Sequence, residues 1–238
     1  MNKPCLARSR RYPAACAAIL LLATAGGCSL LKPAATPEST FYSLEGAPVE
    51  ARAAARPTAS MSQAAPTLIV NPPHAAAGYD SKRIVYLREA HKLEYYAHNQ
   101  WVDTPARMLA PLIVAAVENT GRFRAVVQTP SAAAGDLRLD TEVIRLQHDF
   151  GSLPSRVRFT LRAYIVDNTT RRVLAWREFD EISPASGENP YGGVLGANRS
   201  VLTVLEQLAA FCGEAAANWQ PPAVEGLKRA EGRSLLGR

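Results

Sequence analysis

The sequence contains little of what metal-dependent or covalent catalysis needs. Its 238 residues include four histidines and four cysteines. The histidines, His74, His91, His98 and His148, form no His-Glu-x-x-His pattern, and no two cysteines stand at the spacing of zinc ligands. His148 and Asp149 are neighbours on an expected strand, so their side chains point to opposite faces and do not predict a catalytic dyad. We therefore expect no metal site.

Nucleotide-binding and serine-hydrolase motifs are missing as well. No Gly-x-Ser-x-Gly elbow is present. The glycines of the YGGVLG stretch, Gly192, Gly193 and Gly196, match neither a phosphate loop nor dinucleotide spacing. We interpret this stretch as a mobile loop before the last helix. We expect no enzyme, no catalytic residue and no cofactor.

The basic excess lies largely at the N-terminus. The formal net charge is +6, but the first 27 residues hold four of the 27 basic side chains and none of the 21 acidic ones. From Cys28 onward the balance is 23 against 21, or about +2. Nucleic-acid binding calls for a strong basic excess on one face. We expect no nucleic-acid partner.

The first 28 residues have the pattern of a secretory signal. A basic head precedes an apolar run from Ala14 to Ala25, and Gly26 and Gly27 then lead to Cys28. The run is shorter than the roughly 20 apolar residues of a comfortable membrane span. The ending resembles the lipobox of bacterial lipoproteins, although Ala25 stands where such signals usually carry Leu. We predict a signal peptide over 1–27 and acylation of Cys28. The alternatives are an ordinary signal with an incidental cysteine and an uncleaved anchor.

Processing would leave Cys212 without a disulfide partner. Cys5 and Cys16 leave with the leader and Cys28 is acylated. An unpaired thiol in an oxidising periplasm is compatible with function if it is buried. We predict that Cys212 is a small apolar core residue.

Composition divides the mature chain into three parts. Residues 28–66 form the lipidated N-terminus and a tether rich in Ala, Pro, Ser and Thr, interrupted by the strand-like FYSL stretch at 41–44. A flexible chain of this length has a root-mean-square reach of roughly 35 Å. We expect residues 67–219 to form the folded domain and 220–238 to form a disordered tail.

The domain shows both strand and helix periodicities. We expect a helix that starts at Asp103 or Thr104 and ends at Gly121, with Pro111 on its exposed side, and a last helix over 197–218. A phase change near Val143-Ile144 predicts a bulge. Strands are expected at 67–70, 84–87, 93–96, 123–127, 137–150, 156–165 and 173–182, the second and third as a hairpin. The pattern predicts an α+β fold, a single domain with a mainly antiparallel sheet and two amphipathic helices packed on it.

Two residue groups are candidates for partner binding. Arg156, Arg158 and Arg162 share one side of a strand, and they either contact lipid headgroups or an acidic partner, or pair with carboxylates such as Asp140 and Glu142 on the neighbouring strand. Tyr95, Tyr96 and Trp101 either anchor a partner or cover the edge of the core.

The stretch from 79 to 127 resembles the ABC-type transport auxiliary lipoprotein family. The resemblance rests on Asp80, Ser81, Arg83, Ile84 and Tyr86, on the Tyr96-to-Trp101 spacing before a proline and helix, on FYSL, and on the late ANRSVLTVLEQLAAFC helix. Members include the lipoproteins of paraquat-inducible and of cholesterol- or phospholipid-type transport systems. These motifs are structural, so they indicate a family better than a mechanism.

This resemblance implies an accessory role in moving lipids or hydrophobic solutes across the envelope. The expected partners are the permease and ATPase of an ABC system, reached through its periplasmic subunit of the mammalian-cell-entry type, and a membrane, reached through acylated Cys28. Lipid and a homo-oligomer are further candidates. Ser29 after the cysteine favours the outer membrane, facing the periplasm, over the inner one. The alternatives are a structural or assembly lipoprotein that never handles lipid, and a secreted hydrolase.

Overall fold

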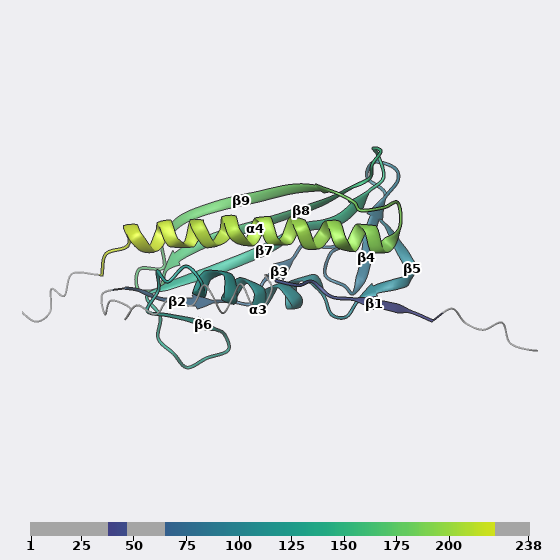
Figure 1. Ribbon diagram of the computed structural model, residues 1–238. Coiled ribbons are helices and arrows are strands. Elements are labelled where there is room, and N and C mark those ends of the chain that lie inside the picture. Colours follow the sequence, from purple (N-terminus) through teal and green to yellow (C-terminus); the bar gives the residue numbers. More distant parts are fainter. Residues whose placement is uncertain (1–37, 47–64, 222–238) are drawn as a thin grey trace, which may run out of the picture. The chain divides into compact units, whose positions relative to one another are not determined.

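The computed structural model describes residues 38–46 and 65–221. The expected signal peptide, the acylation site Cys28, most of the expected tether and residues 222–238 lie outside the described residues. The described part forms one sheet and two helices, in agreement with the predicted α+β fold (Figure 1).

The sheet contains nine strands of the described chain. They are β1 (Thr40–Tyr42), β2 (Thr67–Val70), β3 (His74–Ala75), β4 (Arg83–Leu87), β5 (Glu94–Trp101), β6 (Ala125–Gln128), β7 (Leu137–Asp149), β8 (Arg156–Asp167) and β9 (Val173–Pro184). The long β7 is central: one edge pairs with β8, and the other pairs in turn with β2, β3 and β4.

Antiparallel and parallel pairs are mixed in this sheet. The β4–β5 hairpin and the β7–β8–β9 meander are antiparallel, as predicted. The pairs β1–β5, β2–β6, β2–β7, β3–β7 and β4–β7 are parallel, which strand patterns alone did not indicate. Parallel pairing needs a crossover between the strands, and α3 supplies it between β4 and β7.

The predicted bulge is confirmed in β7. The pairing with β8 shifts register between Val143 and Arg145, so that Ile144 has no opposite residue. Before the shift Leu139, Thr141 and Val143 are buried, and after it Leu146 and His148 are buried. The extra residue therefore keeps one face of a 13-residue strand in the core although its sequence pattern changes phase.

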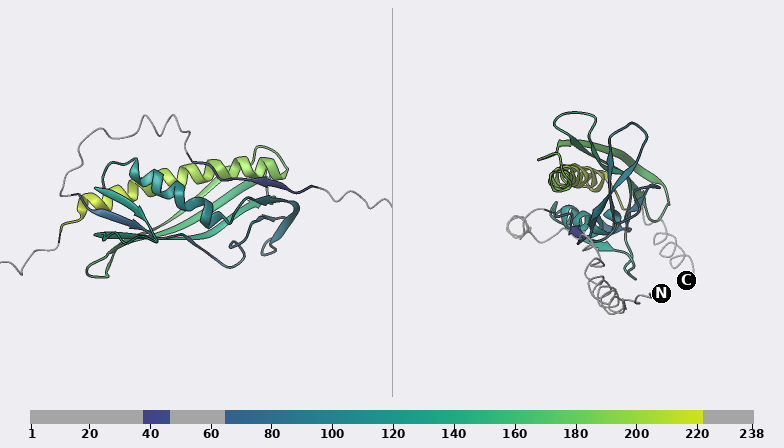
Figure 2. Two further views of the ribbon diagram at one scale, coloured as in Figure 1. Left: turned by 90° about the horizontal axis from the view of Figure 1, so that it is seen from below. Right: turned by 90° about the vertical axis from the view of Figure 1, so that its right-hand side faces the viewer.

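Both helices lie on the same side of the sheet (Figures 1 and 2). Helix α3 (Pro105–Glu118) follows Thr104 and keeps Pro111 exposed, as predicted. The longer α4 (Pro190–Asn218) packs on β8, β9 and α3. Among the described helices, α4 is long and apolar enough to cross a membrane by length and composition alone. Its residues Val201, Val204 and Leu208 are fully buried, so packing on the sheet already accounts for its apolar stripe.

The interpretation of the YGGVLG stretch as a mobile loop is wrong. Helix α4 begins at Pro190, after Asn189 whose side chain accepts a hydrogen bond from the Gly192 amide, so the glycines form its first two turns. A Cβ on Gly193 would lie 2.5 Å from Nδ1 of His148, and one on Gly196 would lie 2.8 Å from Cγ2 of Val157. The glycines let the start of the helix approach β7 and β8 closely.

Two other predictions concern single segments. Cys212 is a free thiol buried in the core on α4, as predicted, and burial raises its pKa to about 12.

The segment 40–44 belongs to the folded body rather than to the spacer around it. Strand β1 pairs with β5, and Leu44 is buried in the core.

Candidate functional site

One face of the sheet is left uncovered by the two helices. Along β7, β8 and β9 the side chains that point away from α3 and α4 are polar or charged, with aromatic residues among them. We call this surface the outer face. Because strand residues alternate between faces, its members follow from the strand register.

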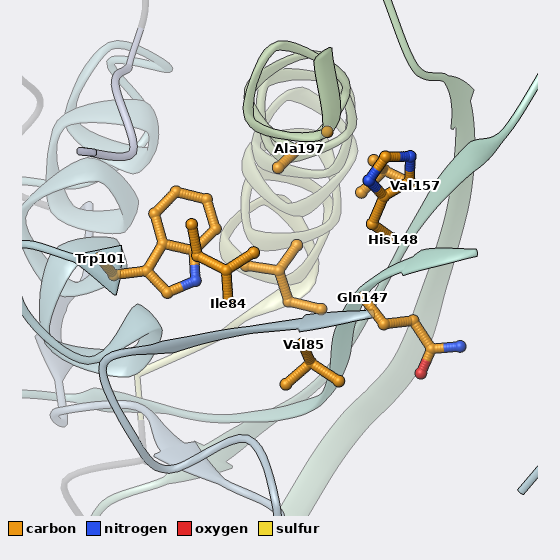
Figure 3. A pocket seen from close by; sticks show the side chains of 9 residues that line it. Ile84, Val85, Trp101, Gln147, His148, Val157 and Ala197 are labelled. Atoms are coloured by element: carbon orange, nitrogen blue, oxygen red, sulfur yellow. The ribbon is translucent and has the colours of Figure 1, made fainter. Parts of the chain in front are cut away.

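A row of directly opposed residues crosses the outer face. Tyr95 on β5 lies opposite Val85, Val85 opposite Gln147, Gln147 opposite Arg158, and Arg158 opposite Ile182 on β9. In Figure 3 Val85 and Gln147 point away from α4. The register therefore brings Tyr95 onto the same face as the arginines, although about 60 residues separate them in sequence. The Arg83 guanidinium lies 3.9 Å from the centre of the Tyr95 ring.

Two of the three predicted arginines are held in ion pairs. Arg158 binds Asp180 on β9 with an N–O distance of 2.6 Å. Arg162 lies 2.8 Å from Glu178 on β9 and 3.6 Å from Glu142 on β7. The hydrogen bond from Arg158 lowers the pKa of Asp180. The sequence analysis considered pairing of these arginines with Asp140 and Glu142. Arg162 does pair with Glu142, whereas Asp140 pairs with Arg138.

Arg156 and Arg145 retain their charge on this face without such a partner. Arg156 is exposed at the end of β8, and no ion pair or hydrogen bond joins its side chain to another described residue. Arg145 lies opposite Thr160 and has no carboxylate within ion-pair distance in the described part of the chain. Arg145, Arg156 and Arg83, which lies over the Tyr95 ring, are therefore arginines of the outer face without a carboxylate partner in the described chain. Arg145 was not among the candidates from the sequence.

The edge of the outer face carries apolar side chains that the sequence analysis did not single out. On β9, Trp176 is 63% exposed, and Val173, Leu174 and Ile182 are also exposed. The Trp176 ring stacks on Tyr164 of β8 with centroids 6.4 Å apart. Strand alternation could have placed Trp176 outward, but the phase of β9 is ambiguous in the sequence because charged residues occupy both faces.

Tyr96 and Trp101 lie on the helix-covered side of the sheet. Trp101 is 2% exposed, so it is a core residue that no partner can reach, and Figure 3 places it on the side of α4. The Tyr96 hydroxyl lies 3.1 Å from Nδ1 of His148, and burial raises the Tyr96 pKa. Of the six predicted partner-binding residues, Arg156, Arg158 and Arg162 share one strand of the outer face. Tyr95 lies on the same face, but β4 and β7 lie between, with buried Val85 and Gln147, and the other two residues lie on the opposite side.

A serine, a histidine and a glutamate converge beneath the start of α4. Nε2 of His148 lies 2.8 Å from the Ser155 hydroxyl, and the Ser155 amide donates to the Glu188 carboxylate over 2.9 Å. Glu188 binds the serine amide and not the imidazole, so it does not orient the histidine as in a hydrolase triad. Ser155 and His148 are 0% and 2% exposed. Burial lowers the His148 pKa, and the bond from Ser155 lowers that of Glu188.

The cavity beside this cluster is too small for a substrate. It is lined by His148, Trp101, Val157 and Gly193 among others, and has a volume of about 10 Å³ (Figure 3). That is close to the space one water molecule needs. We interpret the cluster as a way to satisfy buried polar groups where α4 meets β7.

A larger hollow lies between the two helices. It measures about 170 Å³ and is lined mainly by small and apolar side chains, among them Leu112, Ala116, Leu202 and Ala209. No group of three or more His, Cys, Asp or Glu side chains within the described ranges could hold a metal ion.

Comparison with solved structures supports the fold. Protein XCC0632 from Xanthomonas campestris, of the family DUF330, matches with a TM-score of 0.63 and 23% identity, over 73% of this chain and 94% of that one. An uncharacterised protein matches with a TM-score of 0.54 and 13% identity, over 75% and 98%. No curated protein matches the chain.

The family model for the ABC-type transport auxiliary lipoprotein component matches residues 42–209. This range begins within β1 and extends into α4, so it includes every other described strand and all of α3. The chain belongs to the ABC-type transport auxiliary lipoprotein family.

Proposed function

We propose that this protein is an envelope lipoprotein accessory to an ABC-type system that moves lipids or hydrophobic solutes. Acyl chains on Cys28 hold it in a membrane, and Ser29 after the cysteine favours the outer membrane, with the domain facing the periplasm. Two or more acyl chains give stable anchoring where a single chain is marginal. Membership of a transport auxiliary lipoprotein family supports this assignment.

The docking surface in this proposal is the outer face, and its target is the periplasmic lipid-binding subunit of the transporter. The observation that carries the proposal is that the helices cover one face of the sheet and leave the other open, with Arg145 and Arg156 unpaired in the described chain and Trp176 exposed. Arginine and aromatic side chains are enriched at the centres of protein interfaces.

Charge balance favours a protein over a lipid headgroup at this surface. The outward-facing side chains of β7, β8 and β9 include five carboxylates and five guanidinium groups. Arg158 and Arg162 are already bound to Asp180 and Glu178. Arg145 and Arg156 are open to a headgroup phosphate, but to reach Arg158 and Arg162 it would have to displace these carboxylates. A protein surface with both signs of charge can instead complement them where they stand.

Photo-crosslinking in cells tests the docking proposal. A photoreactive side chain replaces Arg156 on the outer face, and the matched control replaces Arg107, an exposed arginine on α3 at the helix-covered side. We expect position 156 to crosslink to the periplasmic subunit encoded with the permease, and position 107 not to do so. Equal yields at both positions, or no transport subunit at either, would contradict the proposal.

A second experiment separates transport from an assembly role. The full lipoprotein is purified in mild detergent, and bound lipid is measured by mass spectrometry with and without the periplasmic subunit. We expect lipid to accompany the complex. A complex with an envelope protein that contains no lipid and no transport subunit would favour the assembly lipoprotein.

A further inference from the structure

Strand β9 is a long edge strand with no cover in the described structure. It pairs with β8 along its length and with no other described strand. Its 12 residues are mostly exposed. Every second residue of an edge strand directs its backbone N–H and C=O outward, so such an edge is a template for one more strand.

The interior of β9 is protected by charge alone. Charged side chains, proline and bulges block unwanted pairing of an edge strand, and Arg177, Glu178, Asp180 and Glu181 are the charged residues here. Between Val173 and Ser183 the strand contains no proline and no lysine, and the one register shift with β8 lies at its beginning, beside Val173. Val173, Leu174, Trp176 and Ile182 are exposed on the same strand. These charges disfavour indiscriminate pairing and restrict the edge to a strand whose charges complement them.

We propose that β9 pairs antiparallel with β9 of a second copy of this chain, about a two-fold axis at Phe179. The two sheets then join into one. In this register Trp176 lies opposite Ile182 of the second copy, and Arg177 lies opposite Glu181 of the second copy. An apolar pair and an opposite-charge pair both stabilise directly opposed positions, and two-fold symmetry forms each of them twice.

The side chains at these positions are available for such contacts. Arg177 lies over the Phe211 ring at 4.9 Å and 3.3 Å from Glu214, and because this ion pair is exposed it holds the guanidinium only weakly. Glu181 is half-buried, and no described residue forms an ion pair or hydrogen bond with its carboxylate. The second copy supplies the cation that this carboxylate lacks within the described part of its own chain.

Neighbouring registers fit less well. With the axis at Glu178, Trp176 would lie opposite Asp180 and Arg177 opposite Phe179. With the axis at Asp180, Glu178 would lie opposite Ile182. The axis at Phe179 places Glu178 opposite Asp180, but Arg162 and Arg158 already bind these two carboxylates on β8. Of the three registers, only the axis at Phe179 places Arg177 opposite Glu181 of the second copy.

The test is a charge swap in the full processed lipoprotein, with the oligomeric state measured by sedimentation in detergent over a concentration series. We expect the wild-type protein to dimerise reversibly. R177E and E181R should each weaken the dimer about tenfold or more, because each replaces two attractive pairs with two repulsive ones. The double variant R177E/E181R should restore association, and so should mixing the two single variants.

The control separates the two contacts of Arg177. E214Q removes the ion pair within one chain and should leave dimerisation unchanged, while thermal unfolding verifies that every variant is folded. A wild-type protein that stays monomeric at all concentrations overturns the proposal. So does a swap that fails to restore association, or a larger oligomer that none of these substitutions affects. The outcome is independent of docking on a transporter, because Arg177 and Glu181 do not belong to the outer face.

Discussion

Replacing Gly193 with alanine tests the close approach between α4 and the sheet. The added Cβ would lie 2.5 Å from Nδ1 of His148 and 3.1 Å from its Cε1. Real Cβ atoms do not come this near, so the imidazole or the start of the helix must move. The imidazole is held by Tyr96 at 3.1 Å and Ser155 at 2.8 Å, so it cannot move without losing hydrogen bonds.

The expected cost follows from three contributions. Alanine improves helix propensity over glycine by about 1 kcal/mol. Overpacking a core costs about 1–3 kcal/mol, and a weakened buried hydrogen bond costs about 1 kcal/mol more. We therefore expect Gly193→Ala to lower the free energy of unfolding by about 1–3 kcal/mol. For a domain of this size each kcal/mol lowers Tm by about 2–4 °C.

Gly213→Ala is the matched control on the same helix. There the added Cβ meets only Cγ of Arg122 at 3.4 Å, an ordinary contact with a flexible side chain. The control should raise the free energy of unfolding by about 0.5–1 kcal/mol through helix propensity. Urea denaturation of both variants followed by circular dichroism measures the difference. If Gly193→Ala is as stable as Gly213→Ala, the close packing of α4 on His148 is refuted.

Three further predictions concern single side chains. Cys212 should not react with a thiol reagent at pH 8 in the folded mature protein and should react as one thiol per chain in denaturant, because burial raises its pKa to about 12; a second reactive thiol would mean that Cys28 is not acylated. Lowering the pH below about 6.5 should reduce the free energy of unfolding, because burial lowers the pKa of His148 in the folded state and the unfolded state then binds more protons. H148Q should make the free energy of unfolding less dependent on pH in this range, and an unchanged dependence would assign it to other groups. Cys28→Ala should move the protein from the membrane to the soluble fraction, and retention in the membrane would show that something other than the acyl chain anchors it.

Local patterns of the sequence predicted most of the single elements. The apolar stripe and start of α3, the hairpin of β4 and β5 and the bulge at Val143-Ile144 depend on neighbours along the chain, and all agree with the structure. The helix ends at Glu118, three residues before the predicted Gly121, and Thr104 precedes it without a side-chain cap hydrogen bond. The parallel pairs of β7 depend on which distant segments meet. They have no local signature. The strand patterns therefore predicted a mainly antiparallel sheet but not its parallel pairs.

The candidate site likewise has a part that the sequence predicted and a part that it did not. Arg156, Arg158 and Arg162 share a face because they alternate on one strand, which the sequence displays directly. The placement of Tyr95 on the same face as these arginines, and of Trp101 in the core, depends on the register between separate strands. The start of α4 was misread for a physical reason: glycine normally disfavours a helix, but here close packing against His148 and Val157 outweighs that preference.

The pairing of β1 with β5 limits how far the domain can stand from a membrane. Because Thr40 is fixed in the sheet opposite Asn99, only the residues from Cys28 to Ser39 can span the gap if Cys28 is the lipid attachment point. Twelve residues cover at most about 40 Å when fully extended. The residues between β1 and β2 were also assigned to the tether from composition, but they follow Thr40 in the chain and so cannot add to this standoff. If Cys28 is the lipid attachment point, the edge of the sheet at Thr40 therefore stays within that distance of the anchoring bilayer.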